Sequence, residues 1–164
     1  MRGNDKTPAY LRDHVPQQGA VTDDGEGSCA AFGFLRGLDA RALAVEFRLR
    51  TGNSEWFSYS CLVSWRHNPS VGLLLKFTSD VTSLVLIYGS NLDLPVGQGQ
   101  VNLTDRGLQR HRVTYVREMD EDELSKARKG EPTTDRIDIA EFETVEEQRE
   151  WLKARAPVFI RQQG

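Results

Sequence analysis

The chain has 164 residues, enough for one globular domain with short extensions and too few for a second full hydrophobic core. Hydrophobic residues make up 38% of the chain and charged residues 27%, a slightly lean composition that predicts both ordered and disordered parts. The formal net charge of −3 argues against a protein that tracks nucleic-acid phosphates over one face, because such proteins carry an excess of Lys and Arg.

Residues 1–28 predict a flexible leader, since they mix Pro and Gly with polar residues and sustain no hydrophobic period. Residues 1–6 lack the apolar stretch of a secretion signal, and no run of the chain approaches the about 18 apolar residues that span a bilayer. We therefore expect a cytoplasmic protein with no membrane segment. Cys29 and Cys61 are too few for a disulfide framework and lack metal-ligand spacing, so we expect two reduced thiols.

Alternating apolar residues in the centre of the chain predict four strands. Residues 44–50 form the first, and after a turn at 51–54 residues 55–65 form the second. Residues 71–78 and 81–88 form the third and fourth, and the fourth is apolar on both faces. The short links between them favour sequential antiparallel pairing, because parallel crossovers need longer connections. The predicted core comprises Val45, Phe47, Leu49, Phe57, Tyr59, Val63, Leu73, Leu75, Phe77, Leu84 and Leu86.

The remainder of the chain predicts helices around further strands. We expect short helical segments at 39–43 and 104–110, a strand at 112–118, a charged helix at 120–129 and a strand at 136–142. Thr144 and Glu147 have the spacing of a capping box, which predicts a final helix that ends before Pro157. The predicted class is thus mainly β (α+β), an antiparallel meander in residues 29–118 with an acidic strand–helix extension in residues 119–164 packed on it.

The sequence carries no recognisable catalytic or metal-binding motif. His14, His67 and His111 lack zinc-site spacing, and the acids of residues 120–123 look like a hydrated helix start. We therefore predict no metal, no cofactor and a non-enzymatic assembly or partner-binding module of unknown biological role. An enzyme whose site converges from distant residues is a further alternative.

Two groups of residues are candidates for binding. Trp56 and Leu62 interrupt the polar face of the second strand, which predicts an interface with a second copy of the chain, in a homo-oligomer, or with a protein partner. A basic cluster could hold phosphates and stacked bases, although positive charge is also typical of a solvated edge strand. This cluster consists of Arg106, Arg110, Arg112, Tyr115 and Arg117.

The end of the fourth strand reads Leu86-Ile87-Tyr88-Gly89-Ser90-Asn91-Leu92, which resembles the second sequence motif of the Sm-like proteins, roughly Ile-Arg-Gly-x-Asn-Val. The resemblance covers about residues 34–94, and Tyr88 stands where the family has Arg or Lys. It implies a small, bent five-stranded barrel that assembles into rings through its fourth and fifth strands and binds RNA through loop residues, here Asn68 and Asn91. RNA binding is therefore the alternative function.

Overall fold

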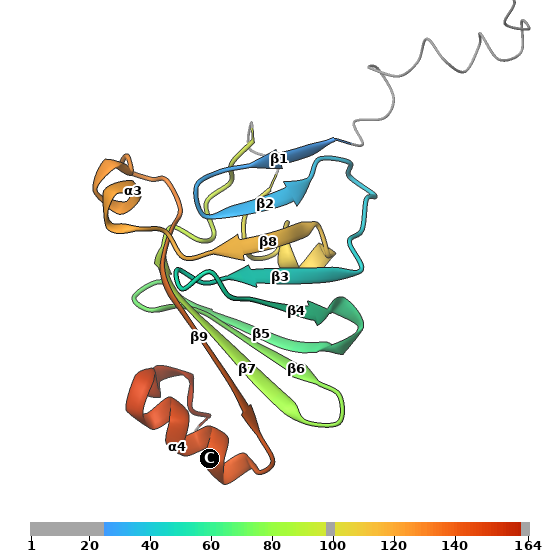
Figure 1. Ribbon diagram of the computed structural model, residues 1–164, viewed down its shortest axis with the longest axis vertical. Coiled ribbons are helices and arrows are strands. Elements are labelled where there is room, and N and C mark those ends of the chain that lie inside the picture. The colour runs from blue at the N-terminus through green and yellow to red at the C-terminus, as the bar shows by residue number, and fades with distance from the viewer. Residues whose placement is uncertain (1–24, 98–100, 162–164) are drawn as a thin grey trace, which may run out of the picture.

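The computed structural model describes residues 25–97 and 101–161, whose strands form two sheets (Figure 1). The five-stranded sheet has the order β1-β2-β8-β3-β4, and the four-stranded sheet has the order β5-β6-β7-β9. The strands are β1 Glu26–Ser28, β2 Phe32–Leu35, β3 Ala44–Arg48, β4 Ser54–Ser58, β5 Leu62–Asn68, β6 Gly72–Thr78, β7 Thr82–Ser90, β8 Val113–Arg117 and β9 Thr133–Phe142. Adjacent strands are antiparallel except β3 and β8, which are parallel.

The predicted fold class, mainly β with antiparallel strands and flanking helices, is confirmed. The described strands do not close into a barrel. Residues 1–24 of the predicted leader lie outside the described residues, and Glu26–Ser28 form β1. In the described part of the chain, no helix combines the length and the apolar character needed to cross a membrane.

The predicted second strand, residues 55–65, is not continuous. A 3-10 turn, Tyr59–Cys61, separates β4 from β5 and carries the chain from one sheet to the other. The Ser58 side chain caps this turn by accepting a hydrogen bond from the backbone N–H of Ser60. The buried Tyr59 hydroxyl donates to the carbonyl oxygen of Val113 at 2.6 Å, which ties the turn to β8. The predicted meander is therefore divided between the two sheets.

The start of β5 also shifts the faces that the sequence predicts. Leu62 pairs with Phe77 and Ser64 pairs with Lys76, so the register jumps at Val63. As a result Leu62 packs against the core, whereas Val63 is 56% exposed. The prediction that Val63 is a core residue is wrong because this β-bulge inserts one residue into the alternation.

The main core lies between the inner faces of the two sheets. Residues predicted for it and found in it include Val45, Phe47, Tyr59, Leu73, Leu75 and Phe77, all nearly inaccessible to solvent, while Leu49 and Phe57 pack against it. Val85 and Ile87 of β7 complete this core from the four-stranded sheet. Phe47 and Phe77 meet edge to face, with ring centroids 6.2 Å apart, so the core joins the two sheets directly.

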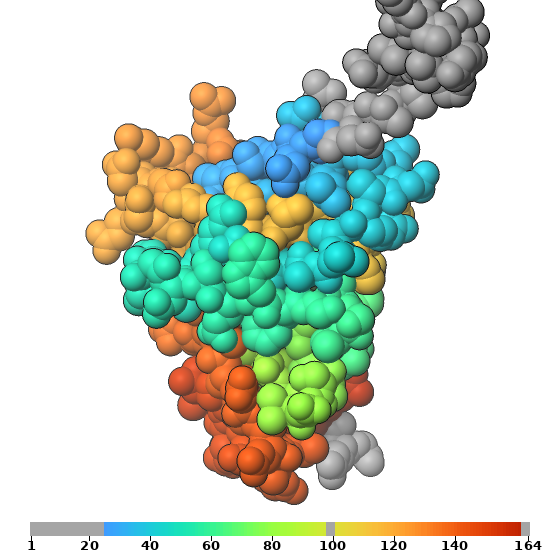
Figure 2. Space-filling model, turned by 45° about the vertical axis from the view of Figure 1, so that its right-hand side comes forward, coloured from blue at the N-terminus to red at the C-terminus, as the bar shows by residue number. Residues whose placement is uncertain are grey.

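Strand β7 is buried on both faces, as its sequence predicts. The prediction that Leu84 and Leu86 belong to the same core as the other strand residues is wrong, because alternation places them on the outer face of β7. There they form a second apolar cluster with residues of the C-terminal segment, including Leu152 and Phe159. Figure 2 shows the C-terminal segment at the end of the molecule away from β1 and β2.

The helices are shorter than the sequence predicts, except the last. Helix α3 spans Glu121–Lys126 and helix α4 spans Val145–Arg155, each opened by a capping box, Asp120 with Glu123 and Thr144 with Glu147. Helix α4 ends before Pro157, as predicted, and a 3-10 turn, Pro157–Phe159, follows. Residues 104–110 contain only the 3-10 turn Leu108–Arg110, and residues 39–43 form no helix.

We predict that Phe47→Ala lowers the free energy of unfolding by about 3–5 kcal/mol, because the ring is fully buried where the two sheets meet. Urea denaturation measures the change. The matched control is Leu43→Ala, at an almost fully exposed side chain, for which we expect less than about 0.5 kcal/mol. A loss below about 1 kcal/mol for Phe47→Ala would remove this residue from the core.

Candidate functional site

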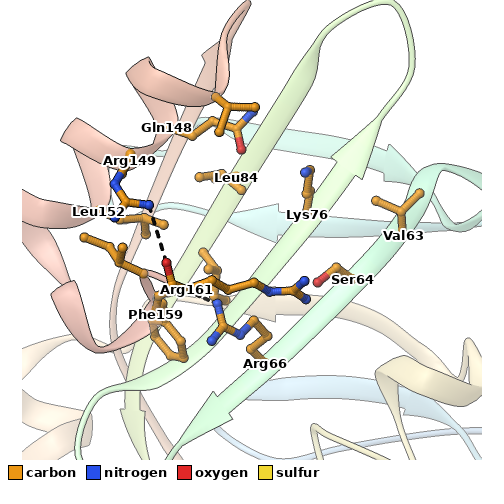
Figure 3. Close-up of a pocket in the computed structure, with 13 residues that line it drawn as sticks. Val63, Ser64, Arg66, Lys76, Leu84, Gln148, Arg149, Leu152, Phe159 and Arg161 are labelled. Atoms are coloured by element: carbon orange, nitrogen blue, oxygen red, sulfur yellow. Dashed lines mark hydrogen bonds between the residues drawn. The ribbon is translucent and has the colours of Figure 1, made fainter. Parts of the chain in front are cut away.

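A pocket of about 330 Å³ lies between helix α4 and the outer face of strands β5, β6 and β7 (Figure 3). Its floor is apolar and comes from the second cluster, with Leu74, Leu84, Leu152 and Phe159 almost completely buried. Two valines on its lining are instead exposed, Val63 at 56% and Val145 at 68%. The pocket therefore offers apolar surface to a ligand and reaches solvent.

Four cationic side chains line the pocket. Arg66 comes from β5, Lys76 from β6, Arg149 from α4 and Arg161 from the segment after α4. No Asp or Glu of the described part of the chain lines the pocket. Within residues 25–97 and 101–161, none of the four cations forms an ion pair with a carboxylate. Like charges over an apolar floor repel one another, so this arrangement favours a bound anion.

The sheet register brings the strand residues of the pocket together. Ser64 pairs with Lys76 and Arg66 pairs with Leu74, while Lys76 pairs on its other side with Leu84. Because side chains of directly opposed residues point to the same face, all five lie on the outer face, beneath α4. The edge strand thus contributes Arg66, and the next strand contributes Lys76, to one surface.

Two arginines are held by backbone carbonyls at the pocket. The Arg66 guanidinium donates to the carbonyl oxygen of Phe159 and lies 5.8 Å from the centroid of the Phe159 ring. Arg149 donates to the carbonyl oxygen of Arg161 at 3.4 Å, the dashed contact of Figure 3. A guanidinium has five N–H donors, so these contacts orient the arginines and leave donors for a ligand.

The predicted basic cluster is largely engaged in holding the fold. Arg112 is 1% exposed, and its guanidinium donates to the carbonyl oxygens of Leu35 and Arg36 at 3.1 and 2.8 Å. Burial lowers the pKa of Arg112. Arg117 makes a two-pronged ion pair with Glu123, at 2.7 and 2.9 Å. Both arginines therefore satisfy groups of the protein itself.

The ring of Tyr115 is in contact with two residues of the neighbouring strands. A Cβ atom at Gly33 would lie 2.1 Å from the ring, so the ring rests directly on this glycine. The Arg48 guanidinium carbon lies 3.7 Å from the ring centroid and contacts the ring as a cation–π pair. Glu46 in turn accepts a hydrogen bond from Arg48 at 2.9 Å. A stacking role for Tyr115 would require Arg48 to move.

The other predicted binding residues lie in turns or on the surface. Asn68 accepts a hydrogen bond from the Ser70 N–H and so stabilises the turn between β5 and β6. Asn91, at φ 57°, donates to the carbonyl oxygen of Glu131, which ties the end of β7 to the segment before β9. Arg110 ends a 3-10 turn, and the backbone N–H of Arg106 donates to Asn102. Trp56 is 65% exposed on the outer face of the five-stranded sheet, whereas Leu62, the other predicted interface residue, packs against the main core.

The described residues include no group of three or more His, Cys, Asp or Glu side chains placed to hold a metal ion. His111 stacks on Tyr59, with ring centroids 4.4 Å apart, and burial lowers its pKa. Cys29 and Cys61 are free thiols, and burial raises the pKa of Cys29.

No family model, no curated protein and no solved structure matches the chain. The resemblance to Sm-like proteins therefore stays a prediction from sequence.

The pocket cations are not apparent in the sequence as a group. Lys76 gives the strongest signal, because it lies between Leu75 and Phe77 in an otherwise apolar strand. Arg66 and Arg161 come from segments that are far apart in the sequence. The contact between Arg66 and Phe159, for example, joins residues 93 positions apart. Only the packing of α4 on the sheet brings them together.

We predict that the ion pair of Arg117 and Glu123 makes stability depend on pH in acid. The hydrogen bonds from Arg117 lower the pKa of Glu123 from 4.5 to about 2. A carboxylate with a depressed pKa stabilises the fold above its unfolded pKa, and that contribution is lost as pH falls toward the folded value. Glu123→Gln should therefore be less stable than the wild type at pH 7, and the difference should shrink between about pH 4.5 and 2.

Denaturant unfolding at several pH values measures this difference. Glu121→Gln is the control, since Glu121 lies in the same helical turn and forms no ion pair in the described part of the chain. A difference between the wild type and Glu123→Gln that stays constant across this pH range would contradict the prediction.

Proposed function

We propose that the chain is a non-enzymatic binding module that holds an anionic group of its partner in the pocket beneath α4. The observation that supports the proposal is a set of four cations that line the pocket over an apolar floor, with no carboxylate of the described residues beside them: Arg66, Lys76, Arg149 and Arg161. The arginines elsewhere that face acids, such as Arg117 and Arg136, form ion pairs with them.

The pocket suits a ligand with both an anionic and an apolar part. Guanidinium groups bind carboxylates and phosphates through paired N–H donors, and their attraction to an anion is stronger beside an apolar floor than in bulk water. The buried leucines and the exposed valines would cover apolar atoms of the ligand, at roughly 25 cal/mol per Å² of apolar surface removed from water. An anion that kept its full hydration shell would leave this apolar surface exposed to water.

The lining of the pocket supports binding rather than catalysis. Ser64 is its one hydroxyl, and no His, Cys, Asp or Glu of the described residues lines the pocket to activate it. A serine nucleophile needs an adjacent general base. RNA binding through the predicted basic cluster gains no support from the structure, because Arg112, Tyr115 and Arg117 are engaged in internal contacts.

The test uses 8-anilinonaphthalene-1-sulfonate, a fluorescent probe with one sulfonate and apolar rings. We expect saturable binding of one equivalent that weakens with salt, and at least about a tenfold loss of affinity, or about 1.4 kcal/mol, in Arg66→Gln/Lys76→Gln. Lys76→Gln alone should show an intermediate loss of affinity. This single variant is needed because replacing Arg66 also removes its hydrogen bond to Phe159, which could change the packing of that residue.

The matched control is Lys126→Gln/Lys129→Gln, which removes the same charge at and after α3. Its affinity should stay within about twofold of the wild type. Equal affinity of the wild type and both pocket variants would contradict the proposal, and so would binding that never saturates. Circular dichroism and urea denaturation confirm that each variant is folded.

A further inference from the structure

We infer that the anionic partner of the pocket is an extended acidic peptide, which adds to the free edge of β5 as a new strand of the four-stranded sheet. This inference rests on the proposed function of the pocket and names the chemistry and the conformation of its ligand.

The first observation is that β5 is an edge strand next to the pocket. It is the outermost strand in the order β5-β6-β7-β9, and its residues, except Val63 at the bulge, pair with β6 on one side. On the other side, no strand of the described chain pairs with it, and the other backbone bonds of β5 are turn bonds at its two ends. An unpaired edge presents a row of N–H and C=O groups to which an extended peptide can add.

The second observation is that charge distinguishes β5 from the other edges. Strand β9, at the opposite edge of the same sheet, carries three acids against one cation, Arg136, which pairs with Asp138, so β9 would repel an acidic peptide. The two edge strands of the five-stranded sheet, β1 and β4, carry Glu26 and Glu55 and no cation. Strand β5 carries Arg66, beside Lys76 of the adjacent strand, and no acid. Opposite charges in neighbouring strands stabilise pairing, and like charges oppose it.

The third observation is that the two faces of β5 differ. Ser64 and Arg66 lie on the outer face and line the pocket. Trp65 pairs with Leu75, which places it on the inner face, where it remains 37% exposed at the edge of the core. The side chains of a strand added next to β5 would alternate between the same two faces. Each of them would lie about 4.5–5.5 Å from the β5 side chain opposite it.

These observations define the sequence of the partner segment. Acidic residues at every second position would lie beside Arg66 and reach Lys76 and Arg161 in the pocket. The residues between them would be apolar and would cover the exposed part of Trp65. Backbone hydrogen bonds would contribute affinity that is independent of sequence, and the pocket would select the alternating acidic pattern.

The test measures fluorescence anisotropy with a fluorescein-labelled, end-blocked heptapeptide in which four Glu alternate with three Val. We expect saturable binding, at least about tenfold tighter than for a peptide with the same residues in block order, because only the alternating peptide separates acids from apolar residues on the two faces of a strand. Two further peptides carry N-methyl groups on all Val or on all Glu residues. Each methylation removes the N–H donors of one strand edge, so at least one of these peptides should lose tenfold or more in affinity.

A variant of the protein separates this inference from the proposed function. Trp65 does not line the pocket, so Trp65→Thr should weaken the alternating peptide at least about threefold and leave the affinity for the sulfonate probe unchanged. Arg66→Gln/Lys76→Gln should weaken both ligands. Lys126→Gln/Lys129→Gln should change neither.

Equal binding of the alternating and block peptides would overturn the inference, as would full affinity of both methylated peptides. Displacement of the peptide by a short oligouridylate at lower concentration would overturn it in favour of a nucleic-acid ligand. If the sulfonate probe binds in the pocket and the peptide does not bind, the inference fails and the proposed function stands. If neither binds, the proposed function fails as well.

Discussion

The double burial of β7 is the constraint on which the rest of the structure depends. Its inner residues, Val85 and Ile87, complete the core between the sheets, while Leu84 and Leu86 require a second cover on the outer face. Helix α4 and the turn after it provide that cover through Leu152 and Phe159. Burying each such side chain is worth roughly 1.5–3 kcal/mol, so the C-terminal segment is bound to the sheet and is part of the domain.

The candidate site is a consequence of how that cover is made. Leu152 is the one buried residue of α4, and the helix leaves part of the outer face of β5 and β6 open beneath it. The open part holds Arg66 and Lys76 over leucines that the second cluster already requires. Arg112 differs from these pocket cations, because its guanidinium lies inside the protein and donates to two carbonyl groups. Arginine side chains therefore stabilise the fold at one place in this protein and line an open pocket at another.

Local patterns in the sequence predict much of the fold. The alternation of Val45 with Phe47 and of Leu73 with Leu75 identifies strands and their buried faces, and the capping box at Thr144 identifies the start of α4. The break between β4 and β5 has no comparable signal in the alternation of residues 55–65, and the contact that ties it to the sheet, from Tyr59 to Val113, spans 54 residues. Strand β2, Phe32–Leu35, is missed for a similar reason, since it is short and its pairing with β8 is distant in sequence. The candidate site could not be predicted for the same reason. Each pocket cation is a single residue in its own segment, and only tertiary packing brings the four together.

On our proposal, the edge of β5 and the pocket beside it form one binding surface. Amide hydrogen exchange followed by NMR, with the alternating Glu–Val peptide added to the full-length chain, can locate that surface residue by residue. We expect alternate amides of residues 62–68 to exchange quickly in the free protein and to become protected on binding, while the amides of β6 and β7, already paired on both sides, change little. Protection confined to the five-stranded sheet or to the loops at Asn68 and Asn91, with no change along β5, would contradict the proposal.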